Sequence, residues 1–325
     1  KASQEFTKLV DITNVPVITT IMGRGSIPTN HPLYIGNIGM HGIYAANKAV
    51  SECDLLFSIG TRFNDRITGK LGEFAPNAKI VHIDIDPAAI SKNIVVDIPV
   101  VADARLAIEN MLPEARRCQT ETWNAKITKW KEEYPLKMNA ESGISPKKII
   151  DTINDTFSEA IIVTDVGQHQ MWTTQYLEMD EHKQLLTSGG LGTMGYGFPA
   201  AMGAKFANPD KTVICISGDG GMQMNIQEMA TAVSWELPLI LCIFNNSCLG
   251  MVRQWQKLFY GKRYSSTCLR SNKNCNTHCG GANSCCPAYS PDFIKLAESY
   301  GAYGIRVEKE EDIKNAFLEA MENKI

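Results

Sequence analysis

The sequence predicts an α/β fold with two doubly wound parallel-sheet domains. Short apolar runs of strand length alternate with segments of helical periodicity along most of the chain, which is the pattern of a parallel sheet covered by helices. Polar or glycine residues directly follow most of these runs, and ligands bind at the carboxyl ends of strands in an open parallel sheet. The length of 325 residues is enough for two domains that each have a core.

The composition is that of an ordinary globular protein. Hydrophobic residues make up 44% of the chain and charged residues 21%, both within the usual range. The formal net charge is −3, which does not favour a nucleic acid or an anionic membrane. No apolar run reaches the length of a membrane span. We therefore expect neither nucleic acid nor a membrane as a partner.

The first domain is expected over residues 1–120, and it opens inside a helical pattern that includes Phe6, Leu9 and Val10. Its strands are expected at 15–20, 55–59, 80–85 and 98–101, and its helices at 43–52 and 105–111. Three of the strands are followed by polar or glycine residues, so a ligand is expected along one edge of this sheet.

A linker with one amphipathic helix is expected over residues 121–144, where Trp123 and Trp130 are interpreted as packing residues. The second domain is expected over 145–325, and Ser145-Pro146 marks the start of its first helix, which runs to about residue 157. Its other helices are expected at 224–236, 291–300 and 310–322, and its strands at 160–164, 184–187, 213–216, 239–244 and 304–307.

The strongest functional signal follows two strands of the second domain. Ser217-Gly218-Asp219-Gly220-Gly221 comes after the first of them, and Asn245-Asn246 comes after the second. Glycines let the backbone approach a ligand and turn N–H groups toward phosphate oxygens. Asp219 and Asn246 supply oxygen atoms of the kind that Mg²⁺ prefers, together with water and phosphate. The stretch therefore predicts a site for a metal-bound diphosphate.

Gly-Asp-Gly, then residues 221–244, then Asn-Asn resembles the diphosphate-binding motif of thiamine-diphosphate enzymes. Residues 223–228 and 249–256 (Leu-Gly-Met-Val-Arg-Gln-Trp-Gln) resemble the acetohydroxyacid synthase, or acetolactate synthase, large catalytic subunit. The resemblance covers nearly the whole chain and implies a central FAD-binding domain followed by a thiamine-diphosphate domain. It also implies a fragment without the family's N-terminal domain, which carries the catalytic glutamate, so we expect the fragment alone to be inactive.

In the second domain the resemblance implies that Asp219 and Asn246 are side-chain ligands of Mg²⁺, with the backbone carbonyl of Cys248 as a third. Met251 matches the position that holds the cofactor bent, and Trp255 the position that favours 2-ketobutyrate as acceptor. The alternative for Trp255 is a core aromatic on an amphipathic helix. The other implied cofactor contacts are Gly167, Gln168, His169, Gly192, Met194, Gly218, Gly220, Gly221 and Gly250.

In the first domain the resemblance implies that Arg66 receives the carboxylate of the acceptor, which suits a bidentate arginine. The alternative for Arg62 and Arg66 is a surface salt bridge, and for His41 a packed loop histidine. Asn64 departs from the family, which has Asp there. The positions implied to line FAD are Thr20, Ile21, Met22, Gly39, Met40, His41, Gly60, Thr61, Arg62, Asn64, Arg66, Asp84 and Asp103.

The implied activity is decarboxylation of pyruvate on thiamine diphosphate with Mg²⁺, and carboligation to a second pyruvate or to 2-ketobutyrate, in branched-chain amino acid biosynthesis. FAD would be structural. A homodimer or homotetramer, a regulatory small subunit and a cytoplasmic location (organellar in a eukaryote) are implied too. The alternatives are a glyoxylate carboligase or pyruvate oxidase, and a non-catalytic nucleotide-binding module.

One segment departs from the family. About twenty extra residues lie between Cys268 and Ser290, and they hold His278 and further cysteines, Cys275, Cys279, Cys285 and Cys286. Zinc or an iron–sulfur cluster could bind there, but the spacing matches no standard ligand pattern. A solvated insertion is the favoured interpretation.

Overall fold

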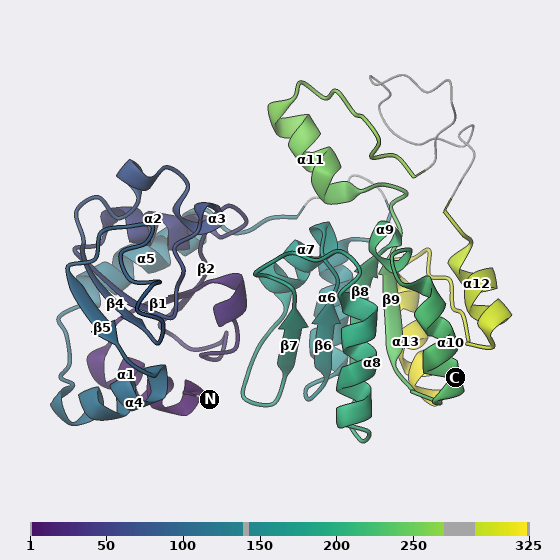
Figure 1. Ribbon diagram of the computed structural model, residues 1–325, viewed down its shortest axis with the longest axis horizontal. Coiled ribbons are helices and arrows are strands. Elements are labelled where there is room, and N and C mark those ends of the chain that lie inside the picture. The colour runs from purple at the N-terminus through teal and green to yellow at the C-terminus, as the bar shows by residue number, and fades with distance from the viewer. Residues whose placement is uncertain (1, 139–142, 270–289, 324–325) are drawn as a thin grey trace. The chain divides into compact units, whose positions relative to one another are not determined.

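The computed structural model of the chain describes residues 2–138, 143–269 and 290–323. It divides into two compact units, which Figure 1 shows with their elements labelled. Unit 1 comprises Lys1–Lys137 with Glu178–Glu181, and unit 2 comprises Met138–Leu177 with His182–Ile325. All strand pairs within the named sheets are parallel, so the predicted fold class is confirmed.

Unit 1 contains two small parallel sheets. One pairs β1 (Val17–Thr19) with β2 (Tyr34–Asn37), and the other has the order β3 (Leu55–Ile59), β4 (Lys79–Asp84), β5 (Ile98–Val101). Its α-helices are α1 (Ser3–Thr13), α2 (Tyr44–Glu52), α3 (Asp65–Thr68), α4 (Ala104–Met111) and α5 (Glu121–Glu133). Strand β2 and helix α3 were not expected. The sequence of β2 includes Gly36 and Asn37, residue types that are depleted in strands.

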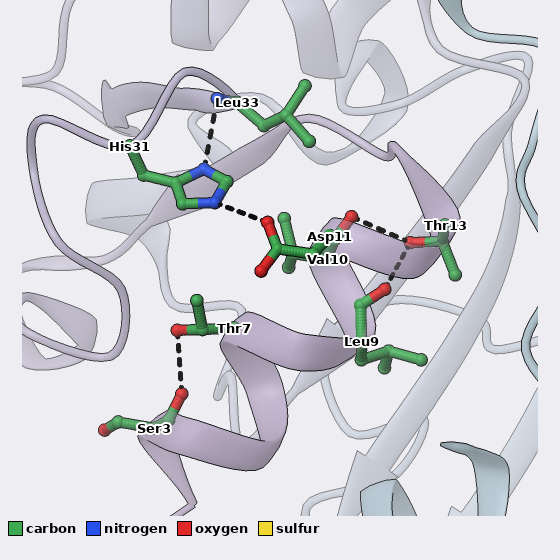
Figure 2. Close-up of polar contacts among 8 residues, drawn as sticks. All are labelled: Ser3, Thr7, Leu9, Val10, Asp11, Thr13, His31 and Leu33. Atoms are coloured by element: carbon green, nitrogen blue, oxygen red, sulfur yellow. Dashed lines mark hydrogen bonds and ion pairs between the residues drawn. The ribbon is translucent and has the colours of Figure 1, made fainter. Parts of the chain in front are cut away.

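Helix α1 is tied to the loop that precedes β2, as Figure 2 shows. His31 Nδ1 accepts a hydrogen bond from the Leu33 N–H at 3.2 Å. A neutral imidazole carries its proton on the other nitrogen, so His31 Nε2 donates to Asp11 Oδ1 at 3.0 Å. The Thr13 hydroxyl donates back to the Leu9 carbonyl at 2.7 Å. The contact of His31 with Asp11 thus joins the loop before β2 to α1, whereas the Thr13 bond lies within the helix.

Helix α5 packs against α2 within unit 1. Trp130 is 9% exposed and lies in one core cluster with Ile127 and with small residues of α2 such as Ala46. The rings of Trp123 and Trp130 meet edge to face, with centroids 5.7 Å apart. The interpretation of both tryptophans as packing residues is therefore confirmed.

Unit 2 is built on one parallel sheet with the order β7-β6-β8-β9. Its strands are β6 (Ile161–Thr164), β7 (Gln184–Thr187), β8 (Val213–Gly218) and β9 (Ile240–Phe244). Its α-helices are α6 (Pro146–Thr156), α7 (Gln168–Tyr176), α8 (Gly197–Ala207), α9 (Asp219–Met222), α10 (Met229–Ser234), α11 (Gly250–Phe259), α12 (Phe293–Tyr300) and α13 (Ile313–Glu322).

The two central strands of unit 2 are buried on both faces. Val163 and Cys215 belong to the cluster completed by residues of α8, α10 and α12. The alternate positions Ile162, Ile214 and Ile216 are also 0% exposed. Burial on both sides explains why these strands are continuous apolar runs without a polar alternation. None of the described helices is long and apolar enough to cross a membrane.

Two expected elements of unit 2 are wrong, and Ser145 differs in detail. Residues 304–307 are not a strand: Gly304 packs on Ile294 of α12, and residues 303–308 line a cavity of about 1100 Å³ beside β9. The helix expected at 224–236 is reduced to a 3₁₀ turn (Ile226–Glu228) and α10, and the Asn225 side chain, just before the turn, donates to the Gly195 carbonyl at 2.6 Å. Ser145 precedes α6, but its side chain does not cap it.

Candidate functional site

The carboxyl ends of β8 and β9 lie side by side at one edge of the unit 2 sheet. Gly218, the last residue of β8, pairs with Phe244, the last residue of β9. Helix α9 follows β8 directly, and a turn follows β9. Figure 1 shows α9 at this edge of the sheet. The backbone amides of Ser247 and Cys248 lie close enough to the Asp219 carboxyl to lower its pKa. The predicted metal residues are thus brought to one place.

Asp219 is a buried acid at this edge with one unsatisfied oxygen. Its side chain is 1% exposed, and Oδ1 accepts the Gly220 N–H at 2.9 Å. Its Oδ2 atom accepts no hydrogen bond from any residue that the structure describes. Burial raises the pKa of Asp219 to about 6, against the opposing effect of nearby backbone N–H groups. Burial of a carboxylate oxygen without a hydrogen-bond partner costs free energy. The Oδ2 atom of Asp219 is therefore suited to binding a cation.

Asn246 lies in the turn after β9, directly before the two residues whose backbone amides lie near Asp219. Asn246 Oδ1 accepts the Cys248 N–H at 3.0 Å, and Ser247 takes a left-handed backbone conformation with φ of 57°. An amide oxygen has two lone pairs, so Asn246 Oδ1 can also coordinate a metal. Within the described part of the chain, no group of three or more His, Cys, Asp or Glu could hold a metal ion. A metal at this edge therefore needs amide, backbone, water or phosphate oxygens, as Mg²⁺ does.

Asp165, at the end of β6, organises the neighbouring glycine-rich loop. Its carboxylate is 1% exposed and accepts the N–H of Gly195 at 3.0 Å and of Gly197 at 2.8 Å. A Cβ added to Gly221 would lie 2.7 Å from Asp165 Oδ1. From the sequence, Asp165 was assigned only a place at the end of a strand. An acidic residue directly after the apolar run 161–164 was the signal that could have identified it.

His169 lies in the first turn of α7, behind the β8 end. It is 5% exposed, and a Cβ on Gly218 would lie 3.0 Å from its Nδ1 atom. The ring bonds to the Asp165 backbone, while Nε2 finds no partner among the described residues. Burial lowers the pKa of His169 to about 4, although the charge and backbone of Asp165 oppose this. The imidazole is therefore neutral near pH 7.

Other predicted residues of the second domain gather around this edge. Gln168 Nε2 donates to Gln254 Oε1 at 3.1 Å, which links α7 to α11. A Cβ on Gly220 would meet Met194 Cε at 3.2 Å. The remaining predicted residues are placed as follows: Gly167 before α7, Gly192 with φ of 76° in the loop after β7, Gly250 and Met251 in the first turn of α11, and Trp255 on α11 with its ring centroid 5.0 Å from that of Phe259.

In unit 1, the predicted residues around Arg66 form one group. The Arg66 carbonyl accepts the Met40 N–H at 2.9 Å, and the guanidinium lies 4.0 Å from Asp65. Burial, and then the charge of Arg66, lower the pKa of His41. Gly39 has φ of 105°, and a Cβ there would lie 2.6 Å from the Arg66 carbonyl oxygen. A compact turn thus joins residues 39–41 to α3.

The other predicted residues of unit 1 lie at strand ends or helix starts. Asn64 precedes α3, and its buried Oδ1 has no hydrogen-bond partner among the described residues. Asp103 caps α4 by accepting the N–H groups of Arg105 and Leu106. The rest are Thr20, Ile21 and Met22 after β1, Gly60, Thr61 and Arg62 after β3, and Asp84 at the end of β4. The cysteine-rich segment after Cys268 lies outside the described residues up to Ser290.

Comparison with protein-family profiles matches the two units separately. Residues 165–325 match the thiamine pyrophosphate enzyme, C-terminal TPP binding domain, and residues 1–111 match the thiamine pyrophosphate enzyme, central domain. These two matches, on a fold of parallel sheets, place the chain in the thiamine-pyrophosphate enzyme class.

The relatives narrow this class. The chain is 45% identical to the probable acetolactate synthase large subunit of Methanococcus aeolicus, over 98% of this chain and 54% of that protein. It is 44% identical to the acetolactate synthase large subunit of Cyanidium caldarium, over 97% of this chain and 52% of that protein. It is 39% identical to the acetolactate synthase isozyme 3 large subunit of Escherichia coli, over 98% of this chain and 54% of that protein. The chain belongs to the acetolactate synthase large-subunit family, and it spans about half the length of these relatives.

Proposed function

We propose that the chain provides the metal- and diphosphate-binding part of an acetolactate synthase. The observation that carries the proposal is the buried Oδ2 atom of Asp219, which has no partner in the described chain and lies beside the Asn246 turn. Asp219, Asn246 and the Cys248 carbonyl are the proposed ligands of Mg²⁺. The relatives named above favour this activity over a glyoxylate carboligase, a pyruvate oxidase or a non-catalytic module.

Each side chain at this edge has a separate proposed task. Asp219 supplies the negative charge that holds the metal, and Asn246 a neutral oxygen. The metal in turn would bind the diphosphate oxygens. The space where side chains would stand at Gly218, Gly220 and Gly221 is taken by His169, Met194 and Asp165, so these glycines are proposed to permit the tight turn that brings the backbone to the diphosphate. When bound, thiamine diphosphate supplies the carbanion chemistry that decarboxylates a 2-ketoacid, while the protein orients the cofactor.

Substrate selection is proposed for residues of α11 and of unit 1. Met251 is proposed to support the bound cofactor, and Trp255 to favour 2-ketobutyrate over pyruvate as acceptor, because an indole can contact one additional methylene of the substrate. Arg66 is proposed to bind the carboxylate of the acceptor. Pyruvate would be the donor in each case, and the products would be 2-acetohydroxyacids.

FAD is proposed to bind along the strand ends of unit 1. The buried Oδ1 atom of Asn64 lacks a partner among the described residues. Gly60 has φ of 63°, and a Cβ added there would meet no described atom within 4 Å. Both features fit a ligand that supplies a donor and lies close to the backbone. FAD would be structural. A homodimer or homotetramer, a regulatory small subunit, and a cytoplasmic or organellar location are also proposed, from the family alone.

Calorimetry with Mg²⁺ and thiamine diphosphate tests the site. The change Asp219→Asn should abolish Mg²⁺-dependent binding, because the metal loses its one charged ligand while the side chain keeps its shape. The matched control is Asp210→Asn, at an exposed position near the start of β8, which should bind as the unaltered chain does. In the intact protein, Asp219→Asn should also abolish acetolactate formation from pyruvate. Unchanged cofactor binding in Asp219→Asn would remove Asp219 from the site.

A further inference from the structure

Two cysteines face each other across a short antiparallel bridge next to the proposed metal site. Cys248 pairs with Cys268, and the flanking residues make the two backbone hydrogen bonds: Leu249 N–H to the Thr267 carbonyl and Leu269 N–H to the Ser247 carbonyl, both at 2.8 Å. The cysteines are therefore a non-hydrogen-bonded pair, the arrangement in which opposed side chains lie closest.

The side chains of this pair have the placement that a disulfide needs. Cα atoms in such a pair lie about 4.5 Å apart, within the range of roughly 4.4–6.8 Å found in disulfides. Both thiols are partly exposed and share a hydrogen bond, so they point toward each other and can be reached from solvent. By contrast, Cys215 is fully buried within β8.

We propose that Cys248 and Cys268 form a reversible disulfide when the chain meets a peroxide oxidant. One thiol loses its proton, and the resulting thiolate attacks a peroxide oxygen and breaks the O–O bond. The departing hydroxide takes up the lost proton, so the products are a sulfenic acid and one water molecule. The second thiol then attacks the sulfenic sulfur, which forms the S–S bond and releases a second water molecule. The peroxide is reduced, both cysteines are oxidised, and the thiol hydrogens leave in water. A dithiol reductant reverses the reaction.

The disulfide would close a loop around α11. Residues 249–267 lie between the two cysteines and include all of α11 (Gly250–Phe259). The bond would fix the backbone of Cys248, whose amide donates to Asn246. Local opening of this segment should therefore become rarer in the oxidised chain. Any effect on Mg²⁺ binding rests on the proposed function, whereas formation of the bond does not.

Peptide mapping of the oxidised full chain tests the proposal directly. The chain is treated with hydrogen peroxide, blocked with iodoacetamide and digested with trypsin without reduction. Residues 264–270 form a tryptic peptide in which Cys268 is the one cysteine. This peptide should be found linked to residues 212–253, with fragment ions that place the bond at Cys248. Dithiothreitol should release both peptides.

Variants separate this pair from the other cysteines. Cys268→Ser should lose the linked peptide, whereas Cys118→Ser, at an exposed cysteine of unit 1, should retain it. Amide hydrogen exchange over residues 247–251 should slow on oxidation of the unaltered chain, and should not slow in Cys268→Ser. Recovery of Cys248 and Cys268 as alkylated peptides after peroxide, or of Cys268 linked to another cysteine, would overturn the proposal.

Calorimetry on the same samples separates the two proposals. A chain that forms the Cys248–Cys268 bond but binds no Mg²⁺ with thiamine diphosphate would support the disulfide and overturn the proposed function. A chain that binds both and never forms the bond would overturn the disulfide alone.

Discussion

Two buried ionisable side chains at the candidate site have pKa values shifted toward their neutral forms. Burial lowers the pKa of His169 to about 4 and raises the pKa of Asp219 to about 6. Both shifts have the same physical cause, since loss of water disfavours the charged form of either group. Their effects on stability have opposite signs, because one group gains its charge with a proton and the other loses it.

The sign for each residue can be worked out from these values. As pH falls from 6.5 toward 4, the unfolded chain protonates His169 before the folded chain does, so the free energy of unfolding falls by about 3 kcal/mol. As pH falls from about 6 to 3.8, the folded chain protonates Asp219 first, so the free energy of unfolding rises. The two contributions partly cancel in the unaltered chain.

Urea unfolding at pH 4.5 and 7.5, values chosen to span roughly both shifts, should reveal each contribution separately. His169→Gln removes the group that lowers the free energy of unfolding in acid. The stability of this variant relative to the unaltered chain should therefore improve at the lower pH. Asp219→Asn removes the group that raises the free energy of unfolding in acid. The stability of this variant relative to the unaltered chain should therefore be greater at the higher pH. Identical pH dependence in both variants and in the unaltered chain would contradict the assigned burial of these groups.

At the scale of elements, Asp165 joins β6 to the loop before α8. Asp165→Asn replaces one carboxylate oxygen with an amide group, so it cannot accept all the N–H groups that now converge on Asp165. We expect unit 2 to lose about 2–4 kcal/mol of stability, as for other buried charged hydrogen-bond acceptors. The amides of Gly195 and Gly197 should then exchange faster with solvent.

Asp155→Asn is the matched control for this prediction. Asp155 lies on α6, is exposed and should show a change within about 0.5 kcal/mol. Equal stability of Asp165→Asn and Asp155→Asn in urea would show that the loop before α8 does not depend on the Asp165 carboxylate.

Among the elements that the sequence predicted are the two central strands of unit 2, whose residue pattern follows from burial on both faces. The runs that became β6 and β8 are continuous and apolar because helices cover both sides of the sheet. Segment 304–307 (Gly-Ile-Arg-Val) holds a glycine and an arginine, is not such a continuous apolar run, and is not a strand; its Gly304 lies against Ile294 of α12. Helix α8 was missed because its first residues, Gly197-Phe198-Pro199, have low helix propensity.

Some features of the candidate site could likewise be predicted from the sequence, and others could not. Asp219 and Asn246 could be predicted because each directly follows a strand, and adjacent parallel strands end at one edge. The contribution of Asp165 could not be predicted, because it depends on N–H groups of a loop thirty positions away in the chain. The contact of Cys248 with Cys268 could not be predicted either, because it depends on an antiparallel bridge that the local sequence does not indicate.

At the scale of the whole molecule, each unit has its own hydrophobic core. Ile153 is 0% exposed in unit 2 and Ile127 is 4% exposed in unit 1. Truncation of a buried isoleucine to alanine costs about 2–5 kcal/mol, because it leaves a cavity. Ile153→Ala should therefore increase hydrogen exchange in β6 and β8, and Ile127→Ala in α2 and α5.

These two variants serve as controls for each other. Exchange in β3 and β4 should be unaffected by Ile153→Ala, and exchange in β6 and β8 unaffected by Ile127→Ala. An equal increase across both units in either variant would show that the chain unfolds as one cooperative body.

The crowding around Asp165 limits how this sequence can change over generations. A methyl group at Gly221 would lie 2.7 Å from the Asp165 carboxylate, and one at Gly197 would lie 2.6 Å from the Asp165 backbone nitrogen. A smaller residue at 165 would make room at 221, but it would also remove the acceptor for the Gly195 amide. No single mutation escapes both penalties. Descendants of this gene should therefore keep Gly197 whatever residue stands at 165, because its clash is with the backbone, and should change positions 165 and 221 only together.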